Sequence, residues 1–126
     1  MNHLTPSYSV QVDEARSELH FKTSGLFDDA TMDAFLHEVA KAAGPLLVQK
    51  GKIRAFGDLT EYVTQTREIG AKMAETLLKA EANGIEKTAI VIDSAILKMQ
   101  YQRVSEGRNV EIFSNTNDAL SWLRAP

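Results

Sequence analysis

The stretch TAIVI, residues 88–92, decides the fold, because it is almost entirely apolar and rich in β-branched residues. Such a run, without alternating polar residues, is typical of a central parallel strand that is covered on both faces. A parallel strand needs a crossover connection to its neighbour, and that connection is usually a helix. We therefore expect helices and strands to alternate around this run.

The sequence on both sides of this run follows that pattern. On the amino side we expect a short strand over residues 53–57, and residues 58–61 then lead into a long helix that ends at Asn83-Gly84. Its core stripe is predicted to hold Ile69, Met73, Leu77 and Ala80. On the carboxyl side, Asp93-Ser94 begins a third helix, residues 110–113 form a strand, and residues 115–123 form a last short helix.

The beginning of the chain has a different period. Apolar and polar residues alternate over 8–13 and again over 19–23, which predicts two strands joined as an antiparallel hairpin. After residue 25 the apolar residues recur at helical spacing, and Gly44-Pro45 is expected to end that first helix. The predicted apolar stripe of this helix contains Met32, Phe35, Leu36, Val39 and Ala43.

These elements predict one α/β domain. Strands that alternate with helices favour right-handed crossovers and a mainly parallel sheet, to which the hairpin adds an antiparallel edge strand. We expect a five-stranded sheet with about four helices, in a single domain over residues 1–126 with its core at about 7–124.

Composition excludes several classes of function. The chain has 126 residues, a net charge of −3 and no cysteine, so it has no thiol chemistry and no disulfide. Its basic residues are scattered, which argues against binding to nucleic acid. The sequence has no secretory signal and no apolar run long enough to cross a membrane, and we expect a cytoplasmic protein.

Few residues indicate catalysis. Asp58 and Asp93 follow predicted parallel strands and could together hold a magnesium ion. The simpler expectation is that Asp93 or Ser94 caps the third helix and that Asp58 caps the loop before the second. The histidines His3, His20 and His37 lack the spacing of metal ligands. The sequence has no nucleophile elbow and no phosphate-binding glycine loop. We predict no enzymatic activity, no cofactor and no metal.

Two regions resemble a known family. The sequence FGDLT at 56–60 resembles the strand-end Asp-Leu-Ser of the STAS domain. The strand VEIF at 110–113, followed by DALSWL at 118–123, resembles the end of the SpoIIAA-like group. The resemblance covers residues 7–124 and implies the SpoIIAA/STAS-like architecture.

The resemblance also implies a function. The best-known members of the family are anti-sigma-factor antagonists. They are switched by phosphorylation of a serine at the start of the second helix. In this chain Thr66-Arg67 occupies the position of the family's Asp-Ser pair, so the switch serine is absent. Thr64 or Thr66 could act as a shifted phosphate acceptor, although threonines that open a helix are usually caps.

The leading interpretation is therefore a non-enzymatic regulatory or scaffolding domain that acts by protein contact. Its partner is unknown, and formation of a homo-oligomer is left open. Tyr62 is expected to be exposed and to anchor the interface. The residues expected to form the contact surface are Asp58, Thr60, Tyr62, Thr64, Thr66 and Arg67.

A second interpretation is a domain that binds a small apolar ligand or lipid, because some SpoIIAA-like proteins are likened to CRAL-TRIO domains and to membrane-surface proteins. In the third helix, Met99 projects about 160° away from the predicted core stripe, and Ile96 lies near the edge of that stripe. Ile96, Met99 and Tyr101 are the residues expected to form a lid over the ligand. A single exposed methionine is the simpler explanation.

A magnesium enzyme built on Asp58 and Asp93 is a third interpretation.

Overall fold

The computed structural model describes residues 3–126 and forms one five-stranded sheet with the strands in chain order. β1 and β2 form the antiparallel hairpin, and all other neighbouring strands are parallel. The sequence correctly predicts this mixed sheet. The strands are β1 (Ser7–Asp13), β2 (Glu18–Gly25), β3 (Ile53–Tyr62), β4 (Ile85–Val91) and β5 (Val110–Phe113).

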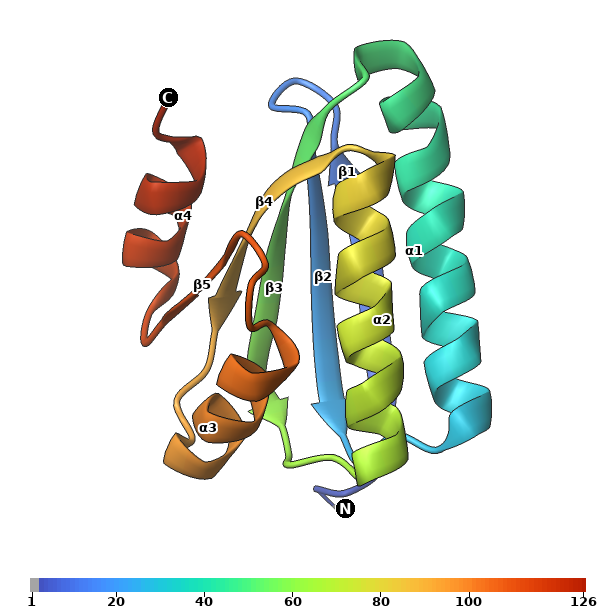
Figure 1. The fold of residues 1–126 in the computed structure, drawn as a ribbon, viewed down its shortest axis with the longest axis vertical. Helices are drawn as coiled ribbons and strands as arrows, with labels where there is room; N and C mark the ends of the chain where they lie inside the picture. The colour runs from blue at the N-terminus through green and yellow to red at the C-terminus, as the bar shows by residue number, and fades with distance from the viewer. Residues whose placement is uncertain (1–2) are drawn as a thin grey trace.

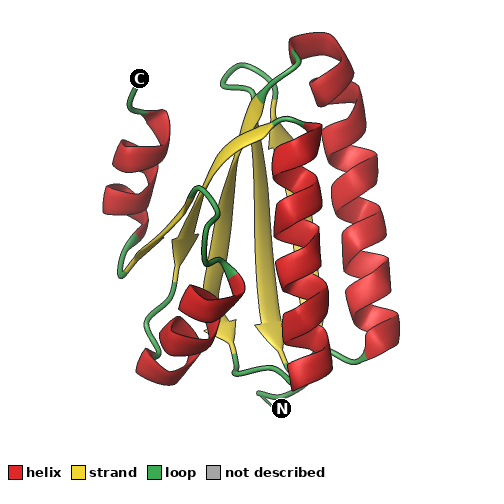
Figure 2. Ribbon diagram, viewed as in Figure 1, coloured by secondary structure: helices red, strands yellow, loops and turns green. Residues whose placement is uncertain are grey.

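Helices cover the two faces of the sheet unequally. Three of them lie on one face, and the last helix lies alone on the other (Figures 1 and 2). The helices on the first face are α1 (Asp29–Lys50), α2 (Arg67–Asn83) and α3 (Ala95–Val104), and the helix on the second face is α4 (Thr116–Arg124).

Strand β4 is covered on both faces, as its apolar sequence predicts. Ile90 is fully buried against the helices of the larger layer, whereas its neighbour Ala89 is fully buried against α4. Phe56 of β3 and Leu123 of α4 pack in the same small cluster as Ala89. This central strand therefore joins the two halves of the core.

The expectation that Gly44-Pro45 ends the first helix is wrong. α1 continues to Lys50, and Gly51 ends it with a φ of 80° and an N–H that bonds to the Leu47 carbonyl at 2.7 Å. The added turn buries Leu46 against the sheet. A proline inside a helix costs about 3 kcal/mol. Burial of Leu46 offsets about 2 kcal/mol of that cost, and Leu47 packs against the same cluster.

The expectation that the third strand stops at residue 57 is also wrong. β3 continues to Tyr62, because Asp58 pairs with Lys22 on one side and with Val91 on the other. Leu59 and Tyr62 are buried along this extension. Residues 58–62 are therefore strand, and the connection to α2 shortens to residues 63–66.

Charged groups fasten α4 to the sheet. Glu18, only 1 % exposed, accepts two hydrogen bonds of 3.0 Å from the Arg124 guanidinium and lies 2.8 Å from the His20 ring. Arg54 and Lys87 donate to backbone carbonyls at the carboxyl end of α4. Cations are favourable there because the helix dipole places partial negative charge at that end.

Candidate functional site

The short connection between β3 and α2, residues 63–66, lies at the carboxyl end of the parallel strands, where open α/β sheets usually carry their sites. The buried side chain of Gln65 holds it. Its amide nitrogen donates to the Gly25 carbonyl at 3.0 Å and to the Val63 carbonyl, and its amide oxygen accepts the Phe27 N–H at 2.9 Å. One side chain thus links β2, the start of the α1 connection and the end of β3.

A second glutamine joins this connection to α3. The side-chain oxygen of Gln100 accepts the Gln65 N–H at 2.8 Å, and its nitrogen donates to the Gln65 carbonyl at 2.9 Å. The reciprocal pair of bonds fixes the backbone of the connection from the α3 side. Residues 63–66 are therefore a rigid connection.

Three residues of the expected contact surface are exposed on or beside this connection: Thr64, Thr66 and Arg67. The Thr66 hydroxyl accepts the Ile69 N–H at 3.2 Å, so Thr66 is the N-cap of α2. Thr64 makes no such cap. We call Thr64, Thr66 and Arg67 the connection surface.

The other three expected residues lie within β3. Asp58 and Thr60 are half-buried, and the Asp58 carboxylate accepts bonds from the Thr60 N–H at 3.0 Å and the Thr60 hydroxyl at 2.7 Å. Asp58 therefore caps no loop, contrary to that expectation. The expectation of an exposed Tyr62 is wrong, because Tyr62 is only 5 % exposed and packs edge-on against Phe27.

Sequence reasoning missed Gln65 and Gln100, which organise the site. A glutamine in a short polar connection is usually solvated, so its local sequence gives no sign of burial. The one sequence feature that could have indicated this role is a glutamine placed in a short connection between a strand and a helix. Its hydrogen-bond partners lie as far as 40 positions away in the sequence.

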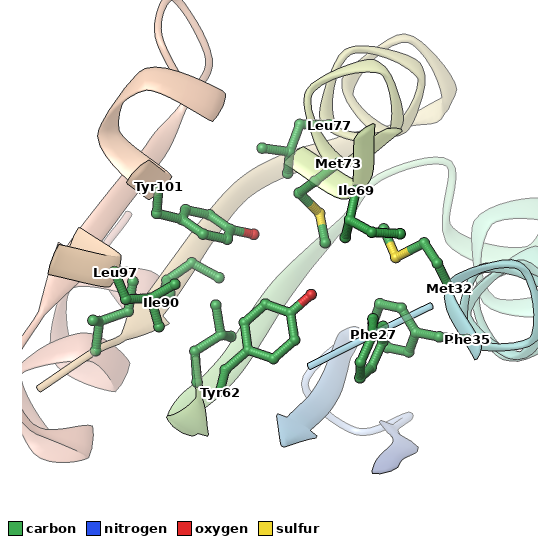
Figure 3. Packing of buried hydrophobic residues seen from close by; sticks show 12 residues of the cluster. Phe27, Met32, Phe35, Tyr62, Ile69, Met73, Leu77, Ile90, Leu97 and Tyr101 are labelled. Atoms are coloured by element: carbon green, nitrogen blue, oxygen red, sulfur yellow. The ribbon is translucent and has the colours of Figure 1, made fainter. Parts of the chain in front are cut away.

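Two tyrosines carry buried polar atoms without partners. The phenol oxygens of Tyr62 and Tyr101 are buried and make no hydrogen bond in the described part of the chain. Figure 3 shows both oxygens directed towards Met73 of α2. Burial raises the pKa of both phenols, and the neighbouring Tyr101 adds to the rise at Tyr62. Both groups are therefore neutral hydroxyls at physiological pH.

A small apolar cavity lies beside Tyr101. It has a volume of about 60 Å³ between α1, α2 and the sheet, and Tyr101, Met73 and Phe35 are among its lining residues. A space of this size is smaller than the usual site for an organic ligand. Anything larger than a few atoms would have to move α1 and α2 apart.

The predicted lid residues separate into two groups. Tyr101 is buried, as its place in the core stripe predicts, but Ile96 and Met99 are 68 % and 56 % exposed on the outer side of α3. The expectation that Met99 lines a ligand space together with Tyr101 is therefore wrong. On a helix, residues three apart share one face, so Ile96 and Met99 form an outward apolar pair.

The unpartnered hydroxyls lead to a stability prediction. Tyr62→Phe and Tyr101→Phe should each raise the free energy of unfolding by about 1 kcal/mol, because each removes a buried hydroxyl without a hydrogen bond. Urea denaturation followed by circular dichroism measures the change. Tyr8→Phe is the matched control, since that ring is only half-buried at the edge of the core. A loss of stability in both core variants would contradict the prediction.

The residues considered for catalysis do not form a cluster. Asp93 is exposed and Ser94 caps α3, which fits the capping interpretation of that segment. Within residues 3–126, no three His, Asp or Glu side chains come together in a way that could hold a metal ion. Over the same residues, no helix is long and apolar enough to span a membrane.

The mixed sheet, with three helices on one face and one on the other, defines the class of the chain as a STAS-type α/β domain. The chain belongs to the SpoIIAA-like family, whose model matches residues 19–124.

Two solved structures share the fold. An uncharacterised protein of the DUF3478 family with a SpoIIAA-like fold, from Shewanella loihica PV-4, is 18 % identical with a TM-score of 0.71, and the match covers 98 % of each chain. An anti-sigma factor antagonist from Mycobacterium paratuberculosis is 16 % identical with a TM-score of 0.64, over 94 % of this chain and 96 % of that one. No curated protein sequence matches this chain.

Proposed function

We propose that the chain is a non-enzymatic regulatory or scaffolding domain that binds a protein partner through the connection surface. The observation that carries the proposal is the double glutamine fastening of residues 63–66, which presents exposed side chains on a fixed backbone. A fixed backbone lowers the entropy cost of forming an interface. The anti-sigma factor antagonist of the same fold supports a partner of the anti-sigma-factor kind.

Thr64 is the better candidate for control by phosphorylation. It is exposed and lies three residues before Arg67, whereas the Thr66 hydroxyl is engaged as a cap. A phosphate on Thr64 would lie near the amino end of α2, where the helix dipole favours negative charge. Mass spectrometry of protein purified from its native cells should find a phosphate on Thr64. Unmodified peptides throughout would exclude this form of control.

The contact proposal is tested by affinity purification from native cells with tagged wild-type protein and with Arg67→Glu. Charge reversal at Arg67 should abolish retention of a stoichiometric partner, because it changes the centre of the surface without touching the core. Lys41→Glu, on the exposed side of α1, is the matched control and should retain the partner. Equal retention by both variants, or no partner with the wild type, would refute the proposal. A kinase-like anti-sigma factor as the retained protein would support the closer analogy.

A second candidate function is binding of a small apolar ligand, with the outward pair of α3 contacting a membrane surface. It is favoured by the unpartnered phenol of Tyr101 beside an apolar cavity, because a ligand with one polar group would satisfy that hydroxyl. A fatty acid would enter this cavity only with α1 and α2 moved apart, and native mass spectrometry should then detect it as a co-purified ligand. Tyr101→Phe should reduce its occupancy, and Met99→Glu should reduce binding to vesicles of anionic phospholipid. Apo protein from native cells would exclude this function.

A further inference from the structure

A pocket of about 300 Å³ lies at the amino ends of β2 and β3, at the opposite end of the sheet from the connection surface. Four cationic side chains from four different parts of the chain meet there. The turn between β1 and β2, the segment before β3, β3 itself and α4 each supply one. The charged lining residues are Arg16, Lys52, Arg54 and Arg124, together with the carboxylates of Glu18 and Glu86.

The carboxylates do not balance the cations. Glu18 is engaged by Arg124, and Glu86 lies 3.1 Å from Arg54. Arg16 reaches only a partly exposed Asp13, at 3.4 Å, and such a pair contributes little in water. Within residues 3–126, Lys52 has no carboxylate at ion-pair distance. A local excess of positive charge therefore stands in a chain of net charge −3.

The two partnered arginines keep unused donors. A guanidinium has five N–H donors. Arg54 uses three of them, on the Leu123 and Ala125 carbonyls and on Glu86, and Arg124 uses two on Glu18. The remaining donors belong to groups whose positions the fold already fixes, so a ligand would meet donors that need no rearrangement.

We propose that this pocket binds a phosphate dianion, carried by a small phosphomonoester. A phosphate matches Lys52, which has no carboxylate, and Arg16, whose one carboxylate partner is partly exposed, and its oxygens accept the parallel bonds that a guanidinium donates. The volume lies at the lower end of the range for small-ligand sites, which suits a phosphate with a short organic group. Arg54 and Arg124 orient the phosphate, and the exposed Arg16 and Lys52 supply further positive charge at the pocket.

The test is an NMR titration of ¹⁵N-labelled protein with glycerol 3-phosphate at low ionic strength. Saturable shifts are expected at the amides of residues 16–18 and 52–54. The double variant Arg16→Gln/Lys52→Gln should raise the Kd by about tenfold or more. Both side chains are exposed and hold no element together, so the variant should remain folded. Lys41→Gln on α1 is the matched control and should leave the Kd unchanged.

The remaining titrations identify the source of the phosphate. Inorganic phosphate should shift the same amides, and weaker binding than glycerol 3-phosphate would assign an organic phosphate to the site. Equal binding would assign free phosphate as the ligand. The proposal of a phosphate site would then stand, and the proposal of an organic phosphomonoester would be wrong. Absence of saturable shifts with either probe, or the same loss of binding in Lys41→Gln as in the double variant, would overturn the proposal.

Discussion

Replacing Arg124 with alanine is expected to lower the free energy of unfolding by about 3 kcal/mol, because it leaves a buried carboxylate without its cation. Glu18 is 1 % exposed, and Arg124 donates a hydrogen bond of 3.0 Å to each of its carboxylate oxygens. His20, the other neighbour, contacts one oxygen only. Urea denaturation at neutral pH measures the loss.

The control for this variant is Arg103→Ala on α3. Its side chain is exposed and near the end of a helix of similar length. It should change the free energy of unfolding by less than about 0.5 kcal/mol. If Arg124→Ala also falls within that range, the ion pair has no structural importance, and α4 is held by apolar packing and by the bonds from Arg54 and Lys87.

The same ion pair predicts a dependence on acid. Burial acts to raise the pKa of Glu18, but bonds from Arg124 and His20 outweigh it, and the pKa is lowered from its usual value of 4.5. The folded protein therefore holds the proton less tightly than the unfolded chain. The contribution of the ionised Glu18 to the free energy of unfolding is fully present above pH 4.5. It is lost as the pH falls from there through the lower pKa of the folded state. Denaturation between pH 6 and 3 should show a smaller acid-dependent loss in Arg124→Ala than in the wild type.

Replacing Gln65 with leucine is expected to lower the free energy of unfolding by about 3 kcal/mol, because each buried group left without a partner costs about 1–3 kcal/mol. The buried Phe27 N–H would lose its bond to this side chain, and the Gly25 carbonyl would keep the longer bond of 3.4 Å that the Val63 N–H donates to it. Hydrogen exchange should also become faster across residues 63–66. Binding of the protein partner through Arg67 should also weaken in this variant.

Gln102→Leu is the matched control, because it is the same substitution at a glutamine that is exposed on α3. It should leave both stability and exchange of residues 63–66 unchanged. An unchanged exchange rate in Gln65→Leu would mean that the connection is rigid for another reason, and the main support for the contact proposal would be lost.

The sequence predicts the elements whose signals are local. The apolar run at 88–92, the strand at 110–113 and the caps Ser94 and Thr66 all act within a few residues of the chain, and the structure confirms them. The added turn of α1 after Pro45 depends instead on apolar partners from other elements. Local rules alone therefore end the helix too early.

The candidate site was predicted less completely than the fold. Thr64, Thr66 and Arg67 are exposed, as expected, but Tyr62 is buried, because the extension of β3 depends on its pairing with β2. The burial of Glu18 also depends on a residue that is distant in the sequence. Its cation lies 106 positions along the chain, and no local pattern indicates such a partner.

The fastening of α4 also affects how the protein is made. Glu18 emerges early from the ribosome, whereas the cation that neutralises it emerges after more than a hundred further residues. Until then the apolar side chains that α4 covers, Phe56 and Val91 among them, face water. A chain interrupted before its last helix therefore carries an exposed apolar patch, which is the feature that chaperones recognise.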